Sequence, residues 1–101
     1  MNNAYRFRIY MENYYCWGPN EYVSKLILDF FGEYGCTIYE AEGTYNNQFE
    51  HTLVVEFVYK DAVAGQAMCK RFSKDFCEWY KQECTMITME PVQMEMCYGD
   101  A

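Results

Sequence analysis

Residues 50–59 read EHTLVVEFVY, and this stretch decides the fold. Successive side chains of a β-strand point to opposite faces of the sheet. One face of this segment carries His51, Leu53, Val55, Phe57 and Tyr59. The other face is also apolar, at Val54 and Val58. A strand with apolar residues on both faces is expected to lie in the middle of a sheet.

The residues before this stretch predict a strand, a helix and a second strand. Residues 5–11 alternate between apolar and polar positions, which is the period of a half-buried strand. From 20 to 34 the apolar positions recur with helical spacing, and Gly35 stands where a left-handed helix end is expected. Residues 36–44 predict a strand, and Tyr-Asn-Asn-Gln at 45–48 predicts a tight turn into the central stretch.

The residues after this stretch predict a second helix and a final strand. Asp61 is suited to cap the start of a helix over residues 62–83. The apolar face of this helix is formed by Met68, Phe72, Phe76, Trp79 and Tyr80. Residues 84–98 alternate twice around Pro91, which predicts one bent edge strand or two short strands. We expect an edge position because proline has no backbone N–H to donate to a neighbouring strand.

The order strand, helix, strand, strand, helix, strand resembles the ferredoxin-like fold, and the resemblance is one of architecture. It implies an α+β fold: a β-α-β-β-α-β sandwich with a four-stranded antiparallel sheet and two helices on one face. We expect strands 5–11 and 50–59 to be central and parallel to one another. The other face of the sheet is expected to be open, and the fold itself implies no function.

The composition predicts one soluble domain over residues 1–101, because 51% of the residues are apolar, enough for one core. No segment has the length of a membrane span or the pattern of a signal peptide, so we expect a cytoplasmic protein without membrane contact. In that compartment the six cysteines are expected to be free and mostly buried. They include no C-x-x-C pair and there is one histidine, so we predict no metal site and no cofactor.

The charge is strongly acidic and unevenly distributed. A net charge of −7 disfavours direct nucleic-acid binding and favours a basic partner. No Lys or Arg occurs between Leu26 and Tyr59, where Glu40 and Glu42 precede the turn and Glu50 and Glu56 follow it. We call these four residues the acidic hairpin. Carboxylates two residues apart on a strand are ~6.6 Å apart, so such a row can enter a groove built for nucleic acid. The simpler interpretation is that the charges keep an edge strand soluble.

In size and composition the chain resembles phage-encoded inhibitors of host nucleases and defence complexes, including anti-CRISPR proteins; the similarity involves no motif. It implies a non-enzymatic interaction protein, in the host cytoplasm if phage-encoded. Its partner would be a larger nucleic-acid-handling protein with a basic surface, and the chain itself a monomer or homodimer. We predict the acidic hairpin as the partner-binding site, with Tyr14, Tyr15 and Trp17 as aromatic anchors. No catalytic residue is predicted.

Alternative functions remain open at this stage. The runner-up is a small-molecule-binding or regulatory domain that dimerises through its sheet face, with a ligand between the subunits or in a tyrosine-rich pocket. An enzyme would need His51 beside a reactive thiol. RNA binding on the open face is disfavoured because strand 50–59 lacks the stacking aromatics that it needs. The methionines from Met86 to Met96 are better explained as core residues than as Cu(I) ligands.

Overall fold

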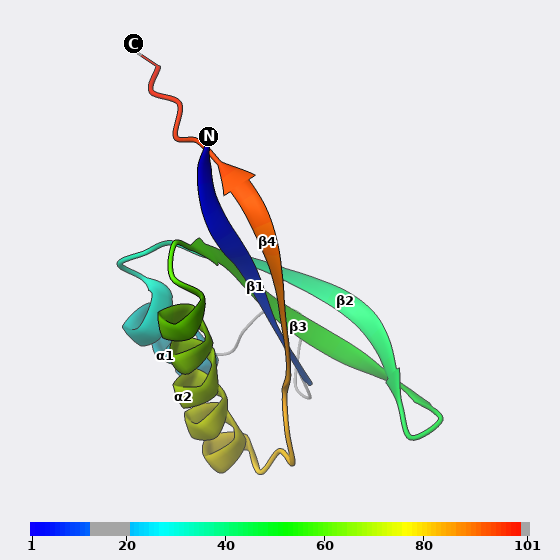
Figure 1. Cartoon of the computed structure of the whole chain (residues 1–101). Coiled ribbons are helices and arrows are strands. Elements are labelled where there is room, and N and C mark those ends of the chain that lie inside the picture. Colours follow the sequence, from blue (N-terminus) through cyan, green and yellow to red (C-terminus); the bar gives the residue numbers. More distant parts are fainter. Residues whose placement is uncertain (13–20, 100–101) are drawn as a thin grey trace.

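The computed structural model describes residues 1–12 and 21–99. It contains β1 (Asn2–Glu12), α1 (Glu21–Phe31), β2 (Thr37–Tyr45), β3 (Gln48–Tyr59), α2 (Ala62–Tyr80) and β4 (Met86–Met94). The four strands form one sheet in the order β2-β3-β1-β4, and both helices lie on the same face of it (Figure 1). The predicted ferredoxin-like α+β fold is therefore confirmed.

The direction of one strand differs from the prediction. β1 and β3 are central, as expected, but they are antiparallel, with Phe7 opposite Phe57. β3 returns from β2 through a tight hairpin, so these two strands must run in opposite directions. The strand that runs in the same direction as β1 is β2, and β3 lies between them. β4 is a single edge strand that holds Pro91 opposite Tyr5, which confirms the edge position of the proline.

Both helices end earlier than their apolar periodicity predicts. α1 stops at Phe31 and is followed by a short turn over residues 32–34. Gly35, directly after this turn, has the expected left-handed conformation (φ 83°). α2 stops at Tyr80 because Lys81 adopts a left-handed conformation (φ 55°), in which the Lys81 N–H donates to the Cys77 carbonyl. At the other end, the Asp61 carboxylate accepts hydrogen bonds from the Val63 and Ala64 N–H groups, as predicted for a helix cap.

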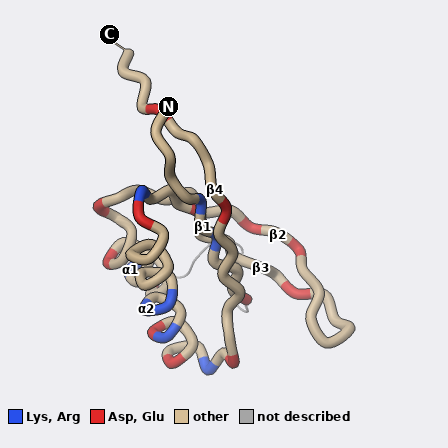
Figure 2. The backbone as a smooth tube through the Cα atoms, in the orientation of Figure 1, with Lys and Arg blue, Asp and Glu red and all other residues tan. Residues whose placement is uncertain are grey.

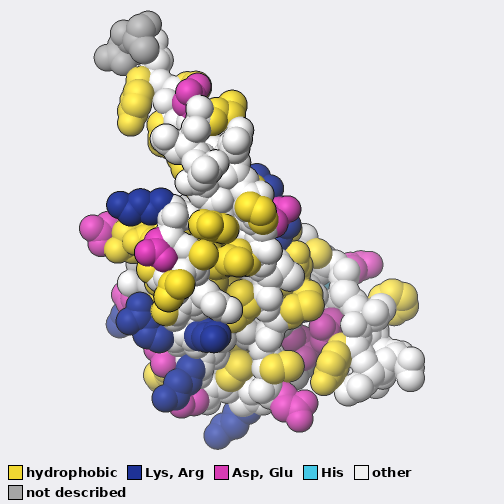
Figure 3. Space-filling model, viewed as in Figure 1, with side chains coloured by type: hydrophobic (Ala, Val, Ile, Leu, Met, Phe, Trp, Pro, Cys, Tyr) yellow, Lys and Arg dark blue, Asp and Glu magenta, His cyan; other side chains and the backbone are white. Residues whose placement is uncertain are grey.

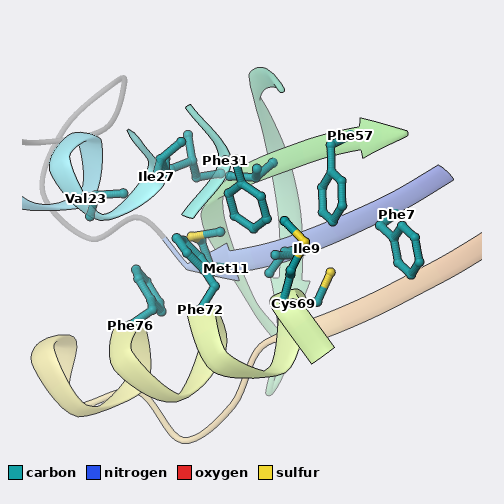
Figure 4. Packing of buried hydrophobic residues seen from close by; sticks show 13 residues of the cluster. Phe7, Ile9, Met11, Val23, Ile27, Phe31, Phe57, Cys69, Phe72 and Phe76 are labelled. Atoms are coloured by element: carbon teal, nitrogen blue, oxygen red, sulfur yellow. The ribbon is translucent and has the colours of Figure 1, made fainter. Parts of the chain in front are cut away.

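The core lies between the helices and the sheet face that they cover (Figure 4). Phe31 is central to it: its ring centroid is 4.8 Å from that of Phe57 in the sheet and 5.3 Å from that of Phe72 on α2. Trp79, expected on the apolar face of α2, is instead 70% exposed and stacks on Tyr22 of α1.

Two parts of the sheet extend past the helical layer in Figure 1. One is formed by the start of β1 and the end of β4, which pair with each other. The other is the turn of the β2–β3 hairpin, at the opposite side of the molecule. Among the residues that the structure describes, no helix has the length and apolar character needed to cross a membrane.

Candidate ligand site at the β2–β3 hairpin

The hairpin turn is set by two asparagines. Asn46 and Asn47 both have positive φ, 51° and 62°, between the paired residues Tyr45 and Gln48. Two successive left-handed residues form the type I′ turn that suits the twist of a two-residue hairpin, and asparagine tolerates this conformation well. The predicted turn is therefore present, and it fixes the pairing of every residue in the two strands.

The register divides the acidic hairpin between the two faces of the sheet. Glu40 and Glu42 pair with Leu53 and His51, on the side of the sheet that the helices cover. Glu50 pairs with Gly43, and Glu56 with Thr37, on the open side. The four carboxylates therefore do not form one row, although Glu40 and Glu42 do share a face.

Two shallow surface hollows lie at the end of this hairpin. One is lined by residues 44–49, from Thr44 through the turn to Phe49. The other is lined by Glu42, Phe49, Glu50 and His51. Phe49 belongs to both and is 84% exposed, and Tyr45 is 52% exposed. Apolar side chains and carboxylates lie side by side in this region in Figure 3. Neither Tyr45 nor Phe49 was predicted from the sequence to be a binding residue.

A carboxyl pair connects the hairpin to β1 on the open side. The pKa of Glu50 is raised because its carboxyl is partly removed from water and because the Glu12 carboxylate is close enough to repel its charge and to hydrogen-bond its protonated form. The pair consists of residues that are distant in the sequence but belong to adjacent strands. The pKa of Glu50 is raised and that of Glu56 is lowered, so Glu50 is the one of these two hairpin carboxyls that holds its proton more strongly.

Within the described part of the chain, the carboxyl groups near this end of the sheet have no Lys or Arg partner. Glu12, Glu40, Glu42 and Glu50 form no ion pair with a Lys or Arg there. One carboxylate oxygen of Glu40 (Oε1) is buried without a hydrogen bond, and so is the side-chain nitrogen of Gln82 (Nε2), in the connection from α2 to β4. Figure 2 shows acidic residues along β2 and β3 and basic residues on α2. The hairpin therefore carries uncompensated negative charge, which attracts cations.

At the centre of the open face, in contrast, the acidic side chains are paired with arginines. Arg8 donates from Nε to Glu56 Oε1 at 2.6 Å and from Nη1 to Glu90 Oε1 at 3.1 Å. Arg6 also binds Glu90, at 3.2 Å, and the Tyr39 hydroxyl donates to Glu56 at 3.3 Å. The predicted partner-binding residue Glu56 is thus held by Arg8. Tyr39 and Val58 add partly exposed apolar surface to the same face.

The ion pair predicts an acid-dependent loss of stability. The hydrogen bond and charge of Arg8 lower the pKa of Glu56 in the folded chain. A lowered carboxyl pKa contributes stability above the ordinary glutamate pKa, and this contribution is lost as the pH falls through the lowered value. We expect the Arg8→Met variant to lose less stability on acidification than the unmodified chain, measured by thermal unfolding from about pH 6 to about pH 3. Arg71→Met, at an exposed position on α2, is the matched control and should keep the original pH profile.

The thiols of three cysteines do not have the environment of a nucleophile. Burial raises the pKa of Cys36 and raises that of Cys69 to about 12; the pKa of Cys77 is raised by burial and by the nearby Cys84. A raised pKa lowers the thiolate fraction. No group of three or more His, Cys, Asp or Glu residues suited to a metal ion occurs in the described residues. The predicted anchors Tyr14, Tyr15 and Trp17 lie outside the described residues.

The fold and the hairpin site define a small ferredoxin-like domain with an open sheet face. Its sequence matches no known family model and no curated protein. Solved structures do match its fold. A phage SAM lyase in complex with S-methyl-5′-thioadenosine has a TM-score of 0.66 at 12% identity, over 89% of this chain and 82% of the lyase chain. A phage SAM lyase in the apo state has a TM-score of 0.59 at 15% identity, over 93% of this chain and 92% of that one.

A third similar structure is CPII, a nitrogen regulatory PII-like protein from Thiomonas intermedia K12, bound to ADP, AMP and bicarbonate. It has a TM-score of 0.57 at 13% identity, over 95% of this chain and 97% of CPII. At such low identity these similarities establish the fold alone. They cover nearly the whole chain.

Proposed function

We propose that this chain binds an adenosine-bearing small molecule of the S-adenosylmethionine (SAM) class at the β2–β3 hairpin. The observation that carries the proposal is the hollow in which Glu42 and Glu50, without a Lys or Arg partner among the described residues, lie beside the exposed ring of Phe49; the exposed Tyr45 lines the other hollow. This is a specific form of the small-molecule-binding alternative that the sequence left open. The ligand named for the SAM lyase and two of those named for CPII, ADP and AMP, contain adenosine, which supports the choice of class.

The chemistry of SAM fits the chemistry of the hairpin. SAM carries a positively charged sulfonium, and Glu42 and Glu50 line one hollow without a compensating Lys or Arg. Its adenine ring offers a flat surface for stacking, and aromatic side chains bind such rings face to face. Phe49, exposed in both hollows, is the ring suited to this contact. A carboxyl with a raised pKa, as in Glu50, also exchanges its proton closer to neutral pH than an ordinary glutamate, as acid–base chemistry on a bound ligand requires.

The hollows on a single chain are open, whereas small-molecule sites usually cover most of the ligand surface. We therefore propose that copies of the chain pack through the open sheet face, so that a second copy covers the side of the hairpin on which Glu50 lies and completes the site there. The ion pairs of Arg8 with Glu56 and Glu90 support this, because charges that are already paired are less costly to cover. Tyr39 and Val58 supply apolar surface for the contact.

Calorimetric titration with SAM tests the site. We expect Glu50→Gln and Phe49→Ala each to weaken binding about tenfold or more, which corresponds to the loss of ~1.4 kcal/mol or more of binding free energy. Binding should also weaken as the pH falls through the raised pKa of Glu50, since the proton competes with the cation, and Glu50→Gln should remove this dependence. Glu33→Gln and Tyr98→Ala, exposed residues away from the hairpin, are the matched controls.

The same samples are analysed for S-methyl-5′-thioadenosine, whose release would mean that bound SAM is cleaved between sulfur and its amino-acid side. ADP is titrated in parallel as an adenosine-bearing anion. Tighter binding of ADP than of SAM, or no effect of Glu50→Gln, would contradict the proposal. Analytical ultracentrifugation at several protein concentrations measures the oligomeric state. A monomer that binds SAM tightly would contradict the proposed packing of copies through the open sheet face.

A second candidate is the binding and inhibition of a larger nucleic-acid-handling protein. The observation in its favour is that Glu40 and Glu42 share a face and form no ion pair with the described residues. Capture from a bacterial lysate, washed at low and at high salt, tests it because salt screens exposed charges. Reversing Glu40, Glu42 and Glu50 to Lys should abolish capture, whereas Glu33→Lys should not. Unchanged capture by the triple variant would exclude the acidic hairpin as the binding surface.

A further inference from the structure

The end of α2 brings two cysteines together. Cys77 lies in the last turn of the helix, and its carbonyl accepts hydrogen bonds from the N–H groups of Lys81 and, at 3.1 Å, of Gln82. The Lys81 bond is that of an αL cap and the Gln82 bond is one of those of a Schellman motif; with the left-handed Lys81 they end the helix and turn the chain. Figure 1 shows the chain turning back at this point toward β4. Cys84 therefore follows a sharp turn that is anchored on the backbone of Cys77.

A second contact fixes the returning segment against the helix. The Thr85 hydroxyl donates to the Ser73 hydroxyl at 2.7 Å. Ser73 lies one helical turn before Cys77 on the same face, since residues four apart in a helix are neighbours on its surface. Thr85 directly follows Cys84. The backbone turn at one end and the Thr85–Ser73 bond at the other thus hold Cys84 near Cys77. The charge of the Cys84 thiolate helps to raise the pKa of Cys77.

We propose that Cys77 and Cys84 form a reversible disulfide that closes the connection between α2 and β4 under oxidising conditions. Both thiols are free in the structure; Cys84 is exposed and Cys77 is half-buried. The inference is independent of the ligand proposed above. The ring that it closes contains Gln82, so the bond would restrict the segment that holds the unpartnered Gln82 side chain.

The reaction needs an oxidant, and a low-molecular-weight disulfide such as oxidised glutathione supplies it. Cys84 loses its proton and its thiolate attacks one glutathione sulfur, which releases one glutathione thiolate. Cys77 then loses its proton and attacks the Cys84 sulfur of the mixed disulfide, which releases the second glutathione. Two protein thiols are oxidised, one glutathione disulfide is reduced to two thiols, and both protons are accounted for. Cys84 attacks first because it is exposed, whereas burial raises the pKa of Cys77.

Intact-mass measurement of the full chain, after treatment with oxidised glutathione, tests the proposal. We expect the chain to lose the mass of two hydrogens and to keep no glutathione on Cys77 or Cys84; any glutathione that it keeps should be absent from the Cys97→Ser variant if it is on the exposed Cys97. Trypsin cuts after Lys74 and Lys81, so the bond should join peptides 75–81 and 82–101. The second peptide also contains Cys97, so the Cys97→Ser variant is measured in parallel and should give the same joined peptides.

The single variants separate the two thiols. Cys77→Ser should retain one glutathione on Cys84, because the second attack is removed, and Cys84→Ser should not lose two hydrogens. Far-ultraviolet circular dichroism confirms that each variant is folded. Stable glutathione on Cys84 in the unmodified chain, or loss of the joined peptides in Cys97→Ser, would overturn the proposal.

Discussion

The Phe31→Ala variant is expected to lose about 3–5 kcal/mol of unfolding free energy, the range measured for truncating buried phenylalanines. Phe31 is fully buried at the end of α1. Its ring contacts Phe57 in the sheet and Phe72 on α2, so it joins the three parts of the core. Domains of this kind are commonly stable by only about 5–15 kcal/mol, and the variant should therefore be partly or largely unfolded at 37 °C.

Urea unfolding followed by circular dichroism measures this loss. Phe49→Ala is the matched control, because it removes the same ring from a position that is 84% exposed. We expect its unfolding free energy to stay within about 0.5 kcal/mol of the unmodified chain. Equal losses in the two variants would mean that Phe31 is not the centre of the core.

Periodicity was sufficient to predict the fold. The apolar positions of β1 and β3 identified the strand faces, and the spacing of Met68, Phe72 and Phe76 identified the buried side of α2. Periodicity does not reveal where a helix stops. α2 ends at Tyr80, because the left-handed Lys81 closes the helix there, and Trp79 is exposed although its neighbour Tyr80 packs against the core. The end of α2 and the exposure of Trp79 depend on how the helix packs in the fold, which the spacing of apolar residues does not show.

The candidate site was predicted in part. Glu40, Glu42 and Glu50 were selected by charge, but their division between the two faces depends on register. That register was available in the sequence: once Asn46 and Asn47 form a two-residue turn, Gly43 must face Glu50. The Glu12–Glu50 pair was not available, since it requires the pairing of β1 with β3. Phe49 carried no signal because an exposed aromatic at a hairpin end has the same pattern as a buried one.

Gly65→Val is the second variant with a large expected effect, a loss of about 1–3 kcal/mol of unfolding free energy, as is typical of overpacked cores. Glycine inside a helix costs about 1 kcal/mol relative to alanine, so its presence in α2 needs a packing reason. A Cβ at position 65 would collide with the ring of Phe7, which is fully buried and stacks on Phe57 at a centroid distance of 5.1 Å. Because the ring is fully buried, it can avoid the collision only by displacing its neighbours in the core.

A double variant separates this collision from any effect on the helix. Gly65→Val combined with Phe7→Leu should be less destabilised than the sum of the two single variants, because the smaller side chain makes room for the valine. Ala67→Val, at an exposed position of α2, should lose less than about 1 kcal/mol, the cost of a β-branched residue in a helix. Strict additivity of Gly65→Val and Phe7→Leu would mean that the two positions are not in contact. The position of α2 on the sheet would then have to be set by a contact other than that of Gly65 with the ring of Phe7.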